Sequence, residues 1–296
     1  MAPVVCCPVR GYPQGEIPGA GGSAGITPRL LKGLIACLLL MLSLAAFAAE
    51  GPSDQQRMSI IIDDVGNNWR LGVAAVELPG NVTISVLPGL AHSRSLAERA
   101  HDRGRQVMLH MPMANHSRFP LGPMGLEMSM SKDEWLATLR EALTDVPHAQ
   151  GVNNHMGSLL TEHPDAMALV MSELAERELF FVDSLTSPRS IAYDTAIAHG
   201  VPALKRQVFL DHEATDEFIS AQFAHALSIM ERYGQVVVIG HPYPETLDFL
   251  EWILPLLDEA GIELVTPDQL IADNGEPPPA TLPTSQRSEE SQLDAP

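Results

Sequence analysis

Short apolar, β-branched runs alternate with segments of helical spacing between Met58 and Ile271, and this alternation constrains the fold more than any other feature. About eight strand–helix units predict a parallel sheet, because parallel strands need a long crossover that is usually a helix. That number suits a closed (β/α) barrel. An open, doubly wound sheet is the alternative, although no strand is followed by a dinucleotide-binding glycine pattern or a P-loop.

The pattern predicts the following elements. We expect strands at 58–62, 82–87, 106–109, 151–154, 179–182, 203–210, 235–240 and 262–265. We expect helices at 69–78, 93–102, 131–146, 164–178, 191–199 and 215–233, and a last one from Pro244. The longest stretch without periodicity, 111–130, is predicted to be a loop that either covers a substrate or is a floppy insertion.

The N-terminal segment 1–48 is predicted to be a leader rather than part of the fold. Arg29 and Lys32 precede an apolar run at 33–47 that ends near a small-x-small cleavage pattern. Because the run is shorter than the roughly 20 residues of a membrane span, we expect a secretory signal peptide. We therefore expect a periplasmic or secreted protein without a stable membrane span, with one domain at 58–273 and a disordered tail at 274–296.

Charge and cysteine content narrow the range of partners and metal ligands. The formal net charge of −19 opposes binding to nucleic acid or to an anionic membrane. Cys6, Cys7 and Cys37 all lie in the predicted leader, so the mature chain would contain no thiol. Any metal must then be held by His, Asp or Glu.

Polar side chains gather where the predicted strands end. The carboxyl ends of parallel strands meet at one edge, which is where such folds build their sites. The residues in question are Asp63, Asp64, His110, Asn154, His155, Asp183, Asp211 and His241. A bland interpretation exists for each: Asp63 and Asp64 could form a capped turn, His110 and His155 could be hydrogen-bonded at the rim, and Asp183 and Asp211 could be helix N-caps.

As a set, these residues suit zinc or a similar divalent ion. One carboxylate and two imidazoles fill three positions and leave a fourth for water, whose pKa falls to about 7 on the metal. The remaining Asp can accept a proton, and a further His can donate one to a leaving group. Soft copper ligation by Met108, Met111 and Met113 is the less favoured alternative to an apolar methionine pocket.

Six motifs resemble the divergent polysaccharide deacetylase family, a branch of the NodB-like deacetylases. They are IIIDDVG (60–66), LHMPM (109–113), GVNNHMGS (151–158), FVDSLTS (181–187), VFLD (208–211) and IGHPYP (239–244). The resemblance implies a distorted (β/α) barrel of seven or eight strands that removes acetyl groups from glycans with a divalent metal. It also implies Asp63 as general base, Asp64 and His110 as metal ligands, and His241 as the acid.

Two departures from the NodB-like pattern bear on this expectation. The second histidine, four residues after the first, is replaced by Ala114, which cannot ligate a metal. GVNNHMGS stands in place of the Arg-containing third motif, and His155 within it is the candidate third ligand. We expect Asn154, Asp183 and Asp211 to contact the substrate or the ligands. The predicted function is a zinc-dependent deacetylase acting on peptidoglycan or polysaccharide; the alternative is a non-catalytic glycan- or partner-binding module.

Overall fold

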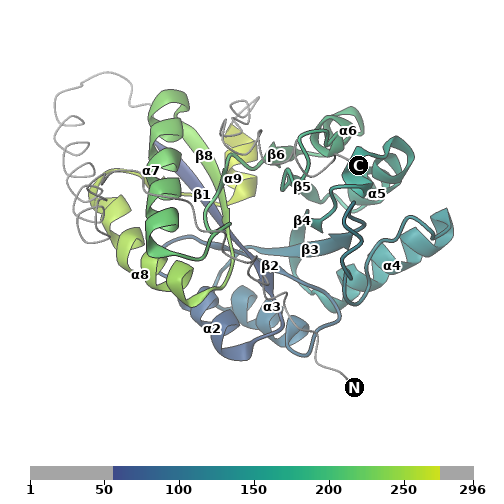
Figure 1. The fold of residues 1–296 in the computed structure, drawn as a ribbon, viewed down its shortest axis with the longest axis horizontal. Coiled ribbons are helices and arrows are strands. Elements are labelled where there is room, and N and C mark those ends of the chain that lie inside the picture. Colours follow the sequence, from purple (N-terminus) through teal and green to yellow (C-terminus); the bar gives the residue numbers. More distant parts are fainter. Residues whose placement is uncertain (1–55, 274–296) are drawn as a thin grey trace, which may run out of the picture.

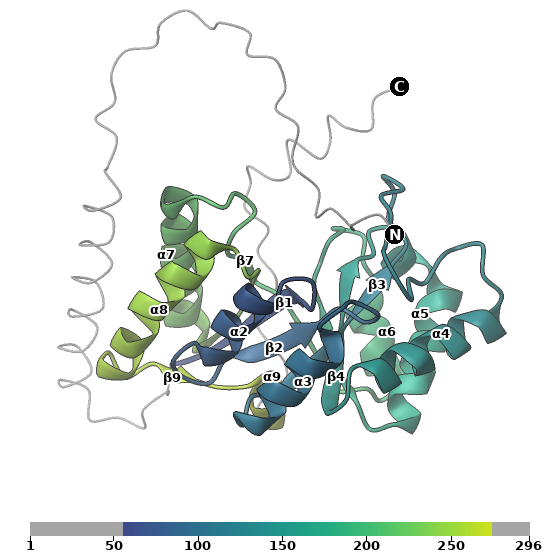
Figure 2. The same ribbon diagram turned by 90° about the horizontal axis from the view of Figure 1, so that it is seen from below.

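The structure is a computed structural model, and it describes residues 56–273. These residues form a nine-stranded sheet of parallel pairs in the order β6-β5-β4-β3-β2-β1-β8-β7, with β9 pairing to β1. Figures 1 and 2 show the helices distributed around the outside of the strands. The predicted leader (1–48) and the predicted disordered tail (274–296) lie outside the described residues.

The elements follow the predicted alternation closely. The strands are β1 (Arg57–Val65), β2 (Thr83–Val86), β3 (Val107–Met113), β4 (Ala149–Met156), β5 (Phe180–Asp183), β6 (Ala203–Lys205), β7 (Val208–Phe209), β8 (Gln235–Gly240) and β9 (Glu263–Leu264). The helices are α2 (Trp69–Glu77), α3 (Ser93–Asp102), α4 (Lys132–Asp145), α5 (Pro164–Glu176), α6 (Ala192–Ala198), α7 (Asp216–Tyr233), α8 (Pro244–Glu259) and α9 (Pro267–Asp273), with a 3-10 turn at Leu160–Glu162.

One short segment brings the two ends of the sheet together. The predicted strand 203–210 is split into β6 and β7, which are the terminal strands of the pairing order. At the split, the amide of Arg206 donates to Asp183 O at 3.0 Å, and the amide of Gln207 donates to Val237 O at 3.0 Å. Consecutive residues thus bond to opposite ends of the sheet. The predicted (β/α) barrel is confirmed, in its distorted form.

The barrel interior contains a small apolar core of its own, which we call the inner cluster. It comprises Ile61, Met108, Phe180, Val182, Leu204, Val237, Ile239, Val265 and Leu270. Because β1 and β5 are not neighbours in the sheet, their residues can share this cluster only across the interior. A larger cluster fills the space between strands and helices, and α9 packs against β1 and β6.

Strands β1, β3 and β4 run at least two residues beyond their predicted ends, and the extension of β3 to Met113 shortens the predicted loop 111–130. His110 lies inside β3 rather than after it, and His155 lies inside β4. Met113 forms a bridge with Leu126, so the irregular segment between β3 and α4 begins after the strand and returns to its end. Met108, Met111 and Met113 are buried in apolar clusters, which fits the apolar interpretation of the methionines.

Helix ends were predictable where side chains cap them. Ser131 accepts from the amide of Glu134 and that side chain returns to Ser131, which is the predicted capping box. Thr215 caps α7 by accepting from Phe218 N at 3.3 Å, so Asp211 is not that helix's N-cap.

Helix α9 was not assigned from the sequence. Among residues 56–273, no helix is both long and apolar enough to cross a membrane.

Candidate metal centre

A bulge in β1 turns two adjacent carboxylates toward the barrel interior. Ile62 pairs with Ile84 and Val65 pairs with Val86, so Asp63 and Asp64 together oppose a single residue of β2. Successive side chains of a regular strand would point to opposite faces. Asp64 departs from this alternation, and its side chain points to the same side as that of Asp63. Its backbone is left-handed, with φ of 57°, which is strained for a residue with a Cβ.

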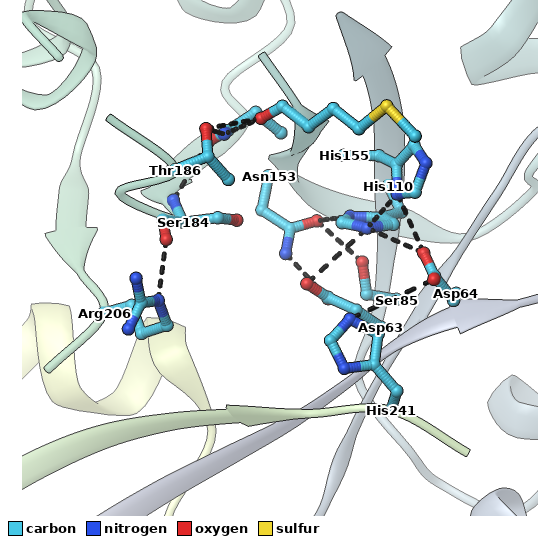
Figure 3. A network of polar contacts seen from close by, with 12 residues as sticks. Asp63, Asp64, Ser85, His110, Asn153, His155, Ser184, Thr186, Arg206 and His241 are labelled. Carbon is cyan, nitrogen blue, oxygen red and sulfur yellow. Dashed lines mark hydrogen bonds and ion pairs between the residues drawn. The ribbon is translucent and has the colours of Figure 1, made fainter. Parts of the chain in front are cut away.

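Asp64, His110 and His155 converge on one point, as Figure 3 shows. Asp64 Oδ1 lies 2.9 Å from His155 Nδ1 and 3.2 Å from His110 Nε2, and the two ring nitrogens are 3.2 Å apart. Ligand atoms about 2.0–2.1 Å from a tetrahedral zinc ion lie roughly 3.3 Å from one another. The three atoms therefore form a triangle of the size that a zinc ion requires.

Asn153 fixes which nitrogen of His110 faces this triangle. Its Oδ1 accepts from Ser85 Oγ at 2.7 Å and lies 2.8 Å from His110 Nδ1, while its Nδ2 donates to Asp63 Oδ1 at 2.8 Å. The donation to a carboxylate identifies Nδ2, so Oδ1 must be the acceptor for His110 Nδ1–H. The lone pair of His110 Nε2 is then directed at the triangle, as a metal ligand requires.

Asp64 Oδ1 also fits a cation. This oxygen is buried, and no donor among the described residues reaches it with hydrogen-bond geometry. Burial raises the pKa of Asp64, but His110 and His155 outweigh burial and hold that pKa well below its usual range. A buried carboxylate oxygen without a donor in hydrogen-bond geometry is costly unless a cation lies beside it. The donor set, one carboxylate and two imidazoles without sulfur, is one that zinc accepts.

Asp63 lies beside the triangle and has a different electrostatic environment. It is only 2% exposed, and its Oδ2 is 3.6 Å from His110 Nε2. Burial raises its pKa above the usual value, and the charges of His110 and His241 together with the Asn153 hydrogen bond only partly offset this. A carboxylate with a raised pKa is a better proton acceptor than an ordinary one.

His241 approaches from β8 on the opposite side. Its Nε2 is 4.0 Å from Asp64 Oδ2, and its Nδ1 is 2.8 Å from Asp211 Oδ1. Asp211 Oδ2 also accepts from the His241 amide at 2.6 Å and from Thr246 Oγ1 at 2.7 Å. Burial lowers the pKa of His241, but the Asp211 hydrogen bond and nearby carboxylate charges outweigh it and raise that pKa to about 9. His241 is thereby held as a proton donor.

Asn154 and Asp183 were predicted to contact the substrate or the ligands, but the structure directs them to the outer face of the barrel. Asn154 Oδ1 accepts from the Ser184 amide at 2.9 Å, and its Nδ2 donates to Met156 O at 2.8 Å. Asp183 accepts from Ser190 Oγ at 2.7 Å and from Leu185 N at 2.9 Å. Both residues hold the segment that follows β5, because strand alternation turns them away from the interior.

The sequence analysis missed Asn153, although the sequence contained the signal. Asn153 and His155 are two residues apart and therefore share one strand face. Asn153 pairs with His110 in the sheet register, which places its amide beside that imidazole. Ala114, where NodB-like enzymes have a second histidine, accepts two amides through its carbonyl and presents no ligand. His155 on β4 supplies the second imidazole instead.

Comparisons with known proteins agree with this architecture. Escherichia coli YibQ, an uncharacterized protein, is 35% identical over 248 residues, covering 82% of this chain and 77% of YibQ. An uncharacterized Haemophilus influenzae protein is 34% identical over 211 residues, covering 71% of this chain and 75% of its own. The crystal structure of an uncharacterized Agrobacterium tumefaciens protein superposes with a TM-score of 0.70 at 22% identity, covering 75% of this chain and 92% of that one.

The sequence profile of one family spans nearly the whole described domain. The family is described as divergent polysaccharide deacetylase, and its profile matches residues 60–271. The match includes every residue of the candidate centre, from Asp63 on β1 to His241 after β8. The chain therefore belongs to the divergent polysaccharide deacetylase family.

Proposed function

We propose that this protein is a zinc-dependent hydrolase that removes acetyl groups from a glycan of the cell envelope, either peptidoglycan or another polysaccharide. The observation that carries the proposal is the triangle of Asp64 Oδ1, His110 Nε2 and His155 Nδ1, with edges of 2.9 to 3.2 Å. Membership of the divergent polysaccharide deacetylase family supports the substrate class. The signal-peptide pattern of the leader supports action in the periplasm or outside the cell.

The residues around the triangle divide the proton transfers between them. A zinc ion, when bound, polarises the acyl carbonyl and makes water acidic enough to supply a nucleophile near neutral pH. Asp63 accepts the proton of the attacking water, since its raised pKa favours protonation. His241 donates a proton to the departing amine, and Asp211 keeps its ring oriented through Nδ1. Asn153 orients Asp63 and His110 together.

The test combines metal content with product release. Purified mature protein should bind close to one zinc per chain and release acetate from acetylated peptidoglycan or chitooligosaccharides. Asp64→Ala should lose the metal, whereas Asp63→Asn should keep the metal and lose turnover. His101→Ala is the matched control, because His101 is exposed on α3 away from the centre. Protein that stays metal-free during zinc and cobalt titration would rule out this function.

A non-catalytic glycan-binding module is the second candidate, and one observation favours it. Ala114 occupies the position at which NodB-like enzymes carry a ligand, so the ligand set differs from theirs. This candidate predicts zinc binding and glycan binding without acetate release from any substrate of the panel. Turnover that disappears in Asp63→Asn would reject it, because a binding module does not need a base.

A further inference from the structure

One buried hydroxyl at the candidate centre has no role in the proton transfers described above. Ser184, directly after β5, is 2% exposed, and its Oγ has no hydrogen-bond partner among residues 56–273. A buried hydroxyl without a partner costs free energy, on the order of 1–3 kcal/mol, so it needs a reason to be there. A bound ligand that accepts its hydrogen would be such a reason.

The position of Ser184 after β5 and the view in Figure 3 indicate where its side chain points. Asn153 on β4 is paired with Val182 on β5, and Val182 belongs to the inner cluster. His155 lies two residues beyond Asn153 on the same face of β4, and Ser184 is the residue that directly follows β5, two beyond Val182. Figure 3 shows the Ser184 side chain directed toward Asn153 and away from Arg206.

The backbone of Ser184 is held on both sides, so the direction of its Cα–Cβ bond is set in advance. Its amide donates to Asn154 Oδ1 at 2.9 Å, and its carbonyl accepts from Arg206 Nε at 2.7 Å. Arg206 Nη2 also donates to Leu185 O at 3.0 Å, and Leu185 holds a left-handed backbone with φ of 48°. Strain of this kind persists only where the surrounding structure enforces it.

Neighbouring uncharged donors are already engaged. Ser85 Oγ donates to Asn153 Oδ1, and Asn153 Nδ2 donates to Asp63. Thr186 Oγ1 donates to Met156 O at 2.6 Å. Of the hydroxyl groups of Ser85, Thr186 and Ser184, that of Ser184 is the one with no acceptor among residues 56–273. Hydrolysis of an acyl group builds negative charge on the carbonyl oxygen, and a donor held in place beforehand stabilises that charge.

We propose that Ser184 Oγ is a substrate-contacting donor that hydrogen-bonds the acyl oxygen of a substrate bound at the candidate centre, on the side of Asn153. This assignment rests on the proposed function and extends it, because it names the protein group that shares the developing charge with the cation. The same donor would hydrogen-bond a carboxylate oxygen of acetate, the product. Acetate is therefore a probe that needs no turnover.

The test measures acetate affinity by calorimetry for zinc-loaded wild type, Ser184→Ala and Ser220→Ala. Ser220 is the matched control, because its hydroxyl is also fully buried and without a partner but lies on α7. Ser184→Ala should bind acetate about 10-fold more weakly or worse, as for loss of a hydrogen bond to a charged group. Ser220→Ala should match wild type, and all three proteins should bind zinc equally.

Thermal melting of the metal-free proteins separates a ligand contact from a structural role. Ser184→Ala should melt no lower than wild type, because the hydroxyl makes no hydrogen bond in the described structure. A lower melting temperature, or equal acetate affinity in wild type and Ser184→Ala, would overturn the assignment while leaving the hydrolase proposal intact. Failure of wild type to bind zinc would overturn both.

Discussion

Inward- and outward-facing residues at the ends of β4 and β5 have the same polar chemistry and opposite tasks. Asn153 and His155 face the barrel interior and contact His110. Asn154 and Asp183 lie next to them in sequence or register, yet they hold the segment after β5. An Asp, Asn or His at a strand end therefore does not by itself belong to the site. The face of the strand on which the side chain lies decides whether it points to the candidate centre or to the segment outside the barrel.

The strongest test of this comparison replaces adjacent residues of one strand. His155→Ala removes one of three candidate ligands and should weaken zinc binding by more than the roughly 10- to 100-fold that loss of a hydrogen-bond partner of a ligand costs. Asn154→Ala should leave zinc affinity within about 2-fold, because the hydrogen bonds of its side chain go to Met156, Ser184 and Thr186 and not to a candidate ligand. Competition titration with a chelator measures both. Equal losses of zinc affinity in His155→Ala and Asn154→Ala would show that inward- and outward-facing residues of β4 do not differ in metal binding.

A smaller effect is expected for the inward residue that orients a ligand without binding the metal. Asn153→Leu keeps a similar volume but removes the acceptor for His110 Nδ1 and the donor to Asp63. Zinc affinity should fall about 10- to 100-fold, as for other partners of metal-binding histidines. The same titration checks this. An unchanged zinc affinity would show that His110 does not need Asn153 to present Nε2.

The smallest effect on the metal is expected from the outward carboxylate. Asp183→Ala leaves Ser190 Oγ and the Leu185 amide without their acceptor, which should cost about 1–3 kcal/mol of unfolding free energy. Zinc affinity should stay within about 2-fold of wild type. Denaturant unfolding of the metal-free protein measures the first quantity. A variant of normal stability and poor zinc affinity would place Asp183 with the inward set.

Much of the fold follows from the sequence because hydrophobic periodicity is a local signal. Buried runs such as QVVVIG on β8 and capping residues such as Ser131 and Thr215 define elements without knowledge of their neighbours. The strands β3 and β4 were drawn too short because polar residues seemed to end them. The predicted strands stopped before His110 and His155, whereas in the structure both residues lie within paired strands, His110 opposite Asn153 and His155 opposite Pro112. Tertiary partners overrode the local signal.

The candidate site was predictable in its membership but not in its geometry. Asp64 and His155 could be singled out, since both were predicted at the carboxyl end of a strand. Their convergence depends on the β1 bulge and on the left-handed backbone of Asp64, which arise from pairing with β2. Neither has a sequence signature at a non-glycine residue. Asn153 was recoverable from period-two spacing alone.

X-ray absorption spectroscopy of the zinc-loaded protein can show directly whether Asp64, His110 and His155 hold the metal. We predict a first shell of nitrogen and oxygen at about 2.0–2.1 Å with the multiple-scattering signature of two imidazoles. One imidazole should disappear in His110→Ala and one in His155→Ala. A spectrum that keeps two imidazoles in either variant, or shows none in wild type, would contradict a metal centre built by Asp64, His110 and His155.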